Sequence, residues 1–143
     1  MRNAIAARSA TRRPVLSASV AYTGGDHMIA SARDFTADFL ASAPAAGHPP
    51  VRVESVDLAR LVVSELVTNV VRHAPGTCRI ALELFTGVLE ISVYDGREAS
   101  PIPRGHNPER VGQHGVEIVV AVCESVTVEP QPSGKRVRAR LPL

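Results

Sequence analysis

Two short segments of alternating polarity, separated by a two-residue turn, restrict the fold of this chain more than any other feature. In residues 78–84 the even positions are apolar, and in residues 89–94 the odd positions are apolar. Alternation with a period of two indicates strands that bury one face. Thr86-Gly87 lies between the segments and is typical of a tight hairpin turn. The pattern predicts an antiparallel hairpin that needs an apolar layer against one of its faces.

Two helical patterns precede the hairpin and can supply this layer. The first covers residues 25–42, and its apolar residues at helical spacing are Met28, Ala32, Phe35 and Phe39. The second covers residues 54–73 and stops before Pro75-Gly76, because proline and glycine terminate helices. Its predicted apolar face contains Val63, Leu66, Val67, Val70 and Val71, and its other face contains Glu65, Thr68, Asn69 and Arg72.

The rest of the chain predicts one more helix and a second pair of strands. A short apolar helix is expected over residues 116–123, and strands over residues 125–129 and 135–141 with a turn at residues 130–134. A polar, proline-containing stretch from residue 96 to about residue 111 has a length typical of functional lids or linkers. This order predicts the α+β class, with helices on one face of a mostly antiparallel sheet.

The composition fits a single domain. The chain has 143 residues, of which 45% are apolar and only 3% aromatic, so Val, Leu, Ile and Ala must build the core. Residues 1–22 are expected to form a flexible tail with a short strand near residues 15–21, and residues 23–143 to form the domain. Cys78 and Cys123 lie in apolar segments without metal-ligand spacing, which indicates buried free thiols in a reducing cytoplasm.

The charge distribution argues against nucleic acid or a membrane as a partner. Four of the 16 basic residues lie in residues 1–13, and the other 12 are matched by 14 acidic residues, so no basic patch is expected on the domain. The basic segment lacks the apolar region of a targeting signal, and no apolar stretch is as long as a membrane span. We therefore expect a cytoplasmic protein.

Asp95 is the most informative single position. It continues the parity of Leu89, Ile91 and Val93, so its side chain is expected to point to the apolar side of the sheet. A carboxylate there is costly unless it meets a hydrogen-bond donor, and an adenine amino group could supply one. The Asp95-Gly96 pair is also compatible with an ordinary turn at a strand end, where parity no longer applies.

Two further groups contain the residue types of a nucleotide site. Glu65 and Asn69 are four residues apart on one helix face, and a carboxylate with an amide can share a hydrated Mg²⁺. Gly112 and Gly115 flank a helix start, where backbone amides favour phosphate. Each pattern also has an ordinary explanation, a solvent-facing polar stripe for the first and turn glycines for the second. The chain contains no Walker A motif, dinucleotide fingerprint or zinc signature.

The order of these groups resembles that in the histidine-kinase-like ATPase superfamily, which contains DNA gyrase, heat-shock chaperones, histidine kinases and mismatch-repair ATPases. Residues 64–74, SELVTNVVRHA, resemble its N-box, and residues 93–96, VYDG, resemble its first glycine box. Residues 112–119 resemble the second glycine box, and residues 134–142 are similar to the closing strand. The resemblance covers about residues 26–143 and is greatest to the anti-sigma-factor serine kinases.

This resemblance implies a Bergerat-type two-layer α/β sandwich that binds ATP and Mg²⁺. It implies that Asn69 contacts the metal and the phosphates, that Glu65 is the general base, and that Asp95 binds adenine. The other nucleotide-binding positions that it implies are Gly96, Gly112, His114, Gly115 and Val116.

Two functions follow from the resemblance. The first is a serine/threonine protein kinase and anti-sigma factor that regulates transcription; its implied partners are a sigma factor and a small anti-sigma-factor antagonist, and its implied assembly is a homodimer. The second is a catalytically silent, nucleotide-gated interaction module. The presence of Glu65 favours the kinase. The proline-containing lid favours the silent module, as does Arg136, which occupies a position where many relatives have a threonine that supports adenine.

Overall fold

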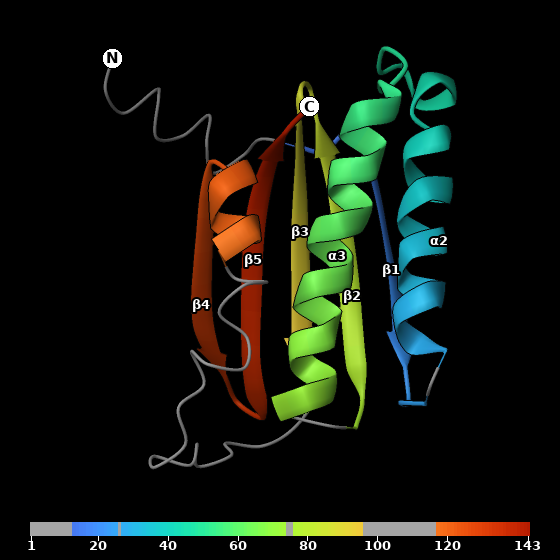
Figure 1. The fold of residues 1–143 in the computed structure, drawn as a ribbon. Coiled ribbons are helices and arrows are strands. Elements are labelled where there is room, and N and C mark those ends of the chain that lie inside the picture. Colours follow the sequence, from blue (N-terminus) through green and yellow to red (C-terminus); the bar gives the residue numbers. More distant parts are fainter. Residues whose placement is uncertain (1–12, 26, 74–75, 96–116) are drawn as a thin grey trace.

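Five strands form one antiparallel sheet in the spatial order β1-β2-β3-β5-β4 (Figure 1). The structure is a computed structural model that describes residues 13–25, 27–73, 76–95 and 117–143. Its elements are β1 (Leu16–Tyr22), α2 (Met28–Ala41), the 3-10 helix η1 (Pro44–Ala46), α3 (Val53–His73), β2 (Cys78–Phe85), β3 (Val88–Asp95), β4 (Ser125–Gln131) and β5 (Gly134–Pro142). A further helical segment covers residues 117–122. The predicted α+β class with an antiparallel sheet is confirmed.

The helices cover one face of the sheet. In Figure 1, α2 and α3 lie side by side along this face, with α2 packed against β2 and α3 against β3. The helical segment at residues 117–122 adds Val119 to the same apolar core. The opposite face, called the open face below, carries none of the described helices (Figure 1).

The core between the two layers follows the alternation in the strands. The inward residues of β2 and β3 are at most 1% exposed, and they are Cys78, Ile80, Leu82, Leu84, Leu89, Ile91 and Val93. The buried apolar residues of α3 are Ala59, Val62, Val63, Leu66, Val67 and Val70. The prediction was wrong for Val71, which is 39% exposed, because one further residue turns the side chain about 100° away from that of Val70.

The sheet begins inside the region expected to be a tail. All seven residues of β1 pair with β2, from Leu16 opposite Leu84 to Tyr22 opposite Cys78. The strand predicted near residues 15–21 is therefore confirmed. Among the helices in the described part of the chain, none is both long enough and apolar enough to cross a membrane.

The two hairpins have tight turns. Gly87 adopts a φ of 76° in the turn between β2 and β3, a conformation that glycine reaches without steric cost. The turn between β4 and β5 is shorter than predicted, because Gln131 already pairs with Gly134 and Pro130 pairs with Lys135. Proline is tolerated there because β4 is an edge strand of the sheet.

His48 connects the loop before α3 to the hairpin of β2 and β3. Its Nε2 accepts a hydrogen bond from the backbone N–H of Gly87 at 3.2 Å, so Nδ1 carries the proton and donates to the carbonyl oxygen of Pro49 at 2.7 Å. The side chain is buried, and both of its ring nitrogens have partners. This end of the sheet is held together by the chain's own polar groups.

Candidate functional site

Asp95 is the last residue of β3 and lies in a row of three residues that pair across neighbouring strands. Its partner on β2 is Cys78, and its partner on β5 is Lys135. Because Asp95 is paired on both sides, strand parity still applies to it, and its side chain points to the helix-covered face. This side chain is only 4% exposed. Asp95 is thus a buried strand residue rather than an exposed turn residue, as the parity of the strand predicts.

Lys135 is the positive partner of this buried carboxylate. Its Nζ lies 3.3 Å from Oδ2 of Asp95, and its own side chain is 44% exposed. A buried carboxylate without such a partner would be strongly destabilising. In the described part of the chain, no partner is seen for the other carboxylate oxygen, Oδ1. Within the described ranges, Asp95 is thus neutralised by one ion pair to a partly exposed lysine.

The third member of the row, Cys78, is a protonated thiol at neutral pH. Burial raises its pKa from 9.0 to about 11, and the negative charge of Asp95 contributes to the rise. The pKa of Cys123 is also raised to about 11, by burial and by Glu124. Both cysteines are free, and Cys78 is buried whereas Cys123 is half-buried. A protonated thiol beside Asp95 is a weak nucleophile, so we assign it no catalytic part.

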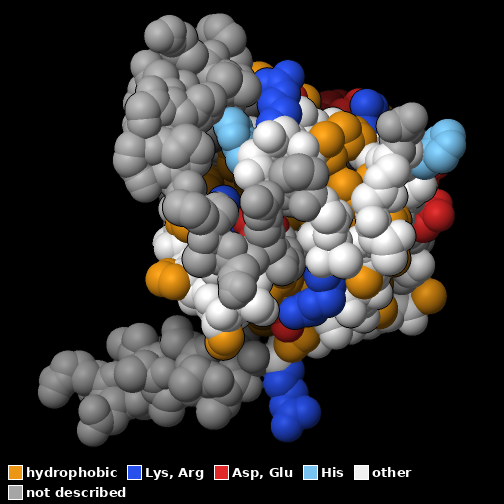
Figure 2. Space-filling model, turned by 90° about the horizontal axis from the view of Figure 1, so that it is seen from below, with side chains coloured by type: hydrophobic (Ala, Val, Ile, Leu, Met, Phe, Trp, Pro, Cys, Tyr) orange, Lys and Arg blue, Asp and Glu red, His pale blue; other side chains and the backbone are white. Residues whose placement is uncertain are grey.

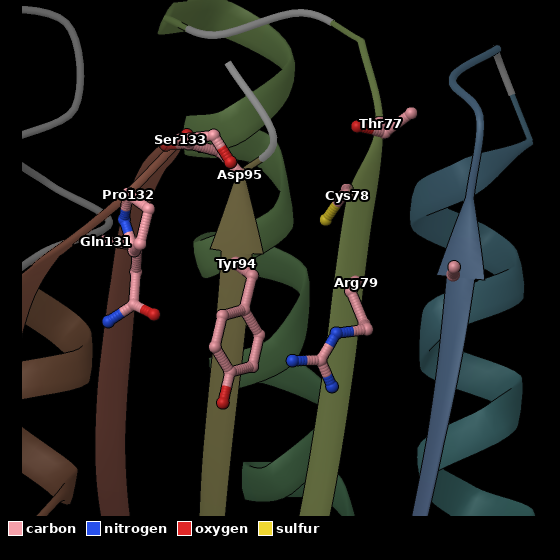
Figure 3. A pocket seen from close by; sticks show the side chains of 9 residues that line it. Thr77, Cys78, Arg79, Tyr94, Asp95, Gln131, Pro132 and Ser133 are labelled. Atoms are coloured by element: carbon pink, nitrogen blue, oxygen red, sulfur yellow. The ribbon is translucent and has the colours of Figure 1, made fainter. Parts of the chain in front are cut away.

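An open depression lies at the end of the sheet where β3 stops. It has a volume of about 360 Å³ and is lined by the start of β2, the end of β3 and the turn between β4 and β5. This volume is at the lower end of the range for small-molecule sites. Figure 3 shows the side chains of Tyr94, Arg79 and Gln131 in front of the sheet, on the face away from the helices, while Asp95 and Cys78 lie at the strand ends beside them. By strand parity Tyr94 and Arg79 face away from the helices, so the depression opens on the open face, whereas the side chain of Asp95 points to the helix-covered face.

Charged side chains are dispersed over this end of the molecule. In the view onto it in Figure 2, Lys and Arg side chains appear at several separate places among apolar and uncharged ones. On the open face, the arginines of β5 are paired with acidic residues: Arg136 and Arg138 with Glu129, and Arg138 and Arg140 with Glu90. Much of the positive charge of β5 is thereby neutralised within the fold.

Glu65 and Asn69 lie in the C-terminal half of α3, on one side of the helix. Both are partly buried, and no hydrogen-bond or ion-pair partner is seen for either in the described part of the chain. Thr68, between them in sequence, donates a hydrogen bond to the carbonyl oxygen of Ser64 at 2.6 Å.

The end of α3 and the end of β3 lie at the same end of the molecule (Figure 1). The structure therefore brings the helix that carries Glu65 and Asn69 to the side of the sheet where Asp95 is buried. The other predicted nucleotide-binding residues lie outside the described residues, and they are Gly96, Gly112, His114, Gly115 and Val116. Within the described ranges, no three His, Cys, Asp or Glu side chains gather as a metal-ligand group.

Lys135 is the residue of this site that the sequence analysis missed. That analysis compared position 136 with the adenine-supporting threonine, but strand parity places Arg136 on the open face. There its guanidinium donates to Ser92 Oγ at 3.1 Å and lies 5.4 Å from the ring centre of Tyr94. The pairing of β3 with β5 instead places Lys135 beside Asp95. Only the register between these two strands could have revealed this.

Comparison of the chain with protein-family models and with curated protein sequences returns no match. The residues of the site and their geometry are therefore the basis for a function of this chain.

Proposed function

We propose that this chain is an ATP-binding regulatory protein with a Bergerat-type sandwich, a member of the histidine-kinase-like ATPase superfamily. Its role would be that of a serine/threonine protein kinase and anti-sigma factor in a partner-switching pathway. The observation that carries the proposal is Asp95, a buried carboxylate at the end of a strand on the helix-covered face. A carboxylate in that position needs hydrogen-bond donors, and Lys135 is the donor that the described part of the chain places beside it.

The residues of the site fit an adenine nucleotide. Oδ2 of Asp95 is neutralised by Lys135, and in the proposed complex Oδ1 would accept a hydrogen bond from the adenine amino group. Burial of the carboxylate makes the recognition selective, because a base without a donor would leave Oδ1 desolvated and unpaired.

Glu65 and Asn69 would act on the phosphate side of the ligand. The side-chain oxygen of Asn69 is a ligand type that Mg²⁺ accepts, and Mg²⁺, when bound, would neutralise phosphate charge. Glu65 would hold the proton that leaves the serine hydroxyl of the partner protein. Both side chains are partly buried, so they can reach a ligand without the cost of full burial.

A catalytically silent, nucleotide-gated interaction module is the second candidate. It is favoured by the surroundings of Glu65, for which no orienting partner is seen in the described part of the chain. A general base is usually held in position by a neighbouring group. Both candidates require the same ATP site, so binding is the first property to test and phosphoryl transfer the second.

Titration calorimetry with ATP, with and without Mg²⁺, tests the shared site. We expect Asp95→Asn to weaken ATP binding by more than tenfold, because it removes a charge-assisted hydrogen bond worth about 1.5–3 kcal/mol. Asp57→Asn is the matched control, since it makes the same change at an exposed position near the start of α3. We expect it to leave ATP affinity unchanged.

The proposal fails if the folded wild-type chain binds no adenine nucleotide at millimolar concentration. It also fails if folded Asp95→Asn binds ATP as tightly as the wild type does, because the buried carboxylate would then have no part in recognition. Circular dichroism of each variant shows whether the fold is retained.

A further inference from the structure

We propose that Lys135 is a second base-reading residue, which donates a hydrogen bond to ring nitrogen N1 of adenine while Asp95 accepts one from the adjacent amino group. This inference rests on the proposed function, because it takes for granted that the base binds at Asp95. It assigns to Lys135 a role in specificity beyond the neutralisation of a buried charge.

The geometry places a donor and an acceptor side by side. Lys135 and Asp95 are directly paired residues on β5 and β3, and Nζ and Oδ2 are 3.3 Å apart. An ammonium group has three N–H donors, so one bond to Asp95 leaves two that can contact a ligand or water. The site therefore presents a carboxylate acceptor beside an ammonium donor.

The exposure of the two side chains agrees with this division of roles. The side chain of Asp95 is 4% exposed, whereas that of Lys135 is 44% exposed and can contact solvent or a ligand. Because the ammonium group lies 3.3 Å from Oδ2, a ligand that bonds to Asp95 binds next to it. Arg136, the next residue, cannot take the role, because it lies on the open face and donates to Ser92.

The edge of adenine has the complementary arrangement. Its amino group is a donor, and N1 next to it is an acceptor, so Asp95 and Lys135 can be satisfied by one base. Lys135 would then contribute to affinity only for bases that have an acceptor at this position.

The test compares ATP with 1-deaza-ATP, in which a C–H group replaces N1, by titration calorimetry. We expect the wild-type chain to bind 1-deaza-ATP about tenfold more weakly than ATP or worse, because a hydrogen bond to a charged group is lost. In Lys135→Met this preference should fall below about twofold, and in Lys135→Arg, which keeps a donor, it should persist. Arg136→Met is the control on the opposite face and should keep the full preference.

Equal affinity of the wild-type chain for ATP and 1-deaza-ATP would overturn the role of Lys135. The proposed function would survive that result, provided that Asp95→Asn still weakens ATP binding. Full preference for ATP in Lys135→Met would likewise show that N1 is read by another group. If the wild-type chain binds neither nucleotide, the proposed function fails and this inference fails with it. The comparison of the two nucleotides needs only the wild-type chain, so misfolding of a variant does not prevent the test.

Discussion

Two buried polar side chains, His48 and Asp95, lie at opposite ends of the sheet and have different surroundings. His48 uses both ring nitrogens within the chain, one with the N–H of Gly87 and the other with the carbonyl of Pro49. Asp95 has one ion pair, to a lysine that is itself 44% exposed, and its Oδ1 has no partner in the described part of the chain. Both side chains are less than 10% exposed, so burial alone does not separate them.

The difference lies in the capacity that remains for a ligand. A buried group whose donors and acceptors are all satisfied contributes to stability and connects parts of the chain. A buried charge with a free acceptor adds little to stability, because its desolvation offsets much of its pairing energy. We therefore expect changes at the His48 end to lower stability, and changes at the Asp95 end to lower ligand binding or chemistry.

The largest expected effect is that of Glu65→Ala on phosphoryl transfer. Loss of a general base lowers a rate by about 10²–10⁴-fold, whereas ATP affinity should stay within about twofold of the wild type because the proposed complex has Glu65 on the phosphate side. The measurement is transfer of labelled phosphate from ATP to a small serine-containing antagonist protein. Glu54→Ala, in the exposed first turn of the same helix, is the control and should retain transfer.

Two other outcomes of this experiment are informative. Full transfer by a folded Glu65→Ala variant would exclude Glu65 as the base. Absence of transfer by a wild-type chain that binds ATP would favour the silent interaction module, and Glu65 would then be a binding residue at most.

The next largest effect is that of His48→Ala on stability. Its removal leaves the N–H of Gly87 without its acceptor and disconnects the loop before α3 from the hairpin. A buried group left unsatisfied costs about 1–3 kcal/mol, which urea unfolding measures directly. ATP affinity should be unchanged, since His48 lies at the opposite end of the sheet from Asp95.

His27→Ala is the matched control, because His27 is exposed and makes no side-chain cap for α2. Its effect on the free energy of unfolding should stay within about 0.5 kcal/mol. If His48→Ala were as mild as His27→Ala while lowering ATP affinity, the assignment of structural and ligand-binding roles to the two ends would be wrong.

Local patterns allowed much of the fold to be predicted from the sequence. Alternation defined β2 and β3 and placed Asp95 on the buried face, because side-chain direction in a strand depends only on parity. The second helix was predicted over residues 54–73 and is observed at Val53–His73. Its apolar period and the Pro75-Gly76 pair after it are local signals, which is why its bounds could be predicted. These features depend on neighbours only a few residues apart.

The features that were missed depend on contacts between distant segments. The bond from Gly87 to His48 joins residues 39 positions apart, and no local pattern indicates it. Lys135 is placed beside Asp95 by the register of β5 on β3, which a single sequence does not specify. The same register pairs Arg136 with Tyr94 on the open face, where Arg136 donates a hydrogen bond to Ser92. The candidate site was therefore predicted through Asp95 but without the residue that neutralises it.

The smallest effect concerns the pH dependence of stability through Cys78. Its folded-state pKa is raised from 9.0 to about 11. Between these values the unfolded chain loses the thiol proton while the folded chain keeps it, so the folded state binds more protons and stability falls as pH rises. From about pH 8 to about pH 9.5 this loss should be about 1 kcal/mol, measured by urea unfolding at each pH. Cys78→Ala should reduce this fall in the free energy of unfolding. In Cys123→Ala, the fall that is due to Cys78 should remain.

The same measurement on Asp95→Asn tests whether the row across β2, β3 and β5 behaves as one electrostatic unit. Burial is the larger cause of the raised pKa of Cys78, and the charge of Asp95 is the smaller one. Removing that charge should therefore lower the thiol pKa and weaken the pH dependence without abolishing it. An unchanged pH dependence would mean that Lys135 already screens Asp95 from the thiol. The ion pair would then be tighter than an exposed lysine suggests, and a ligand would have to compete with it for the carboxylate.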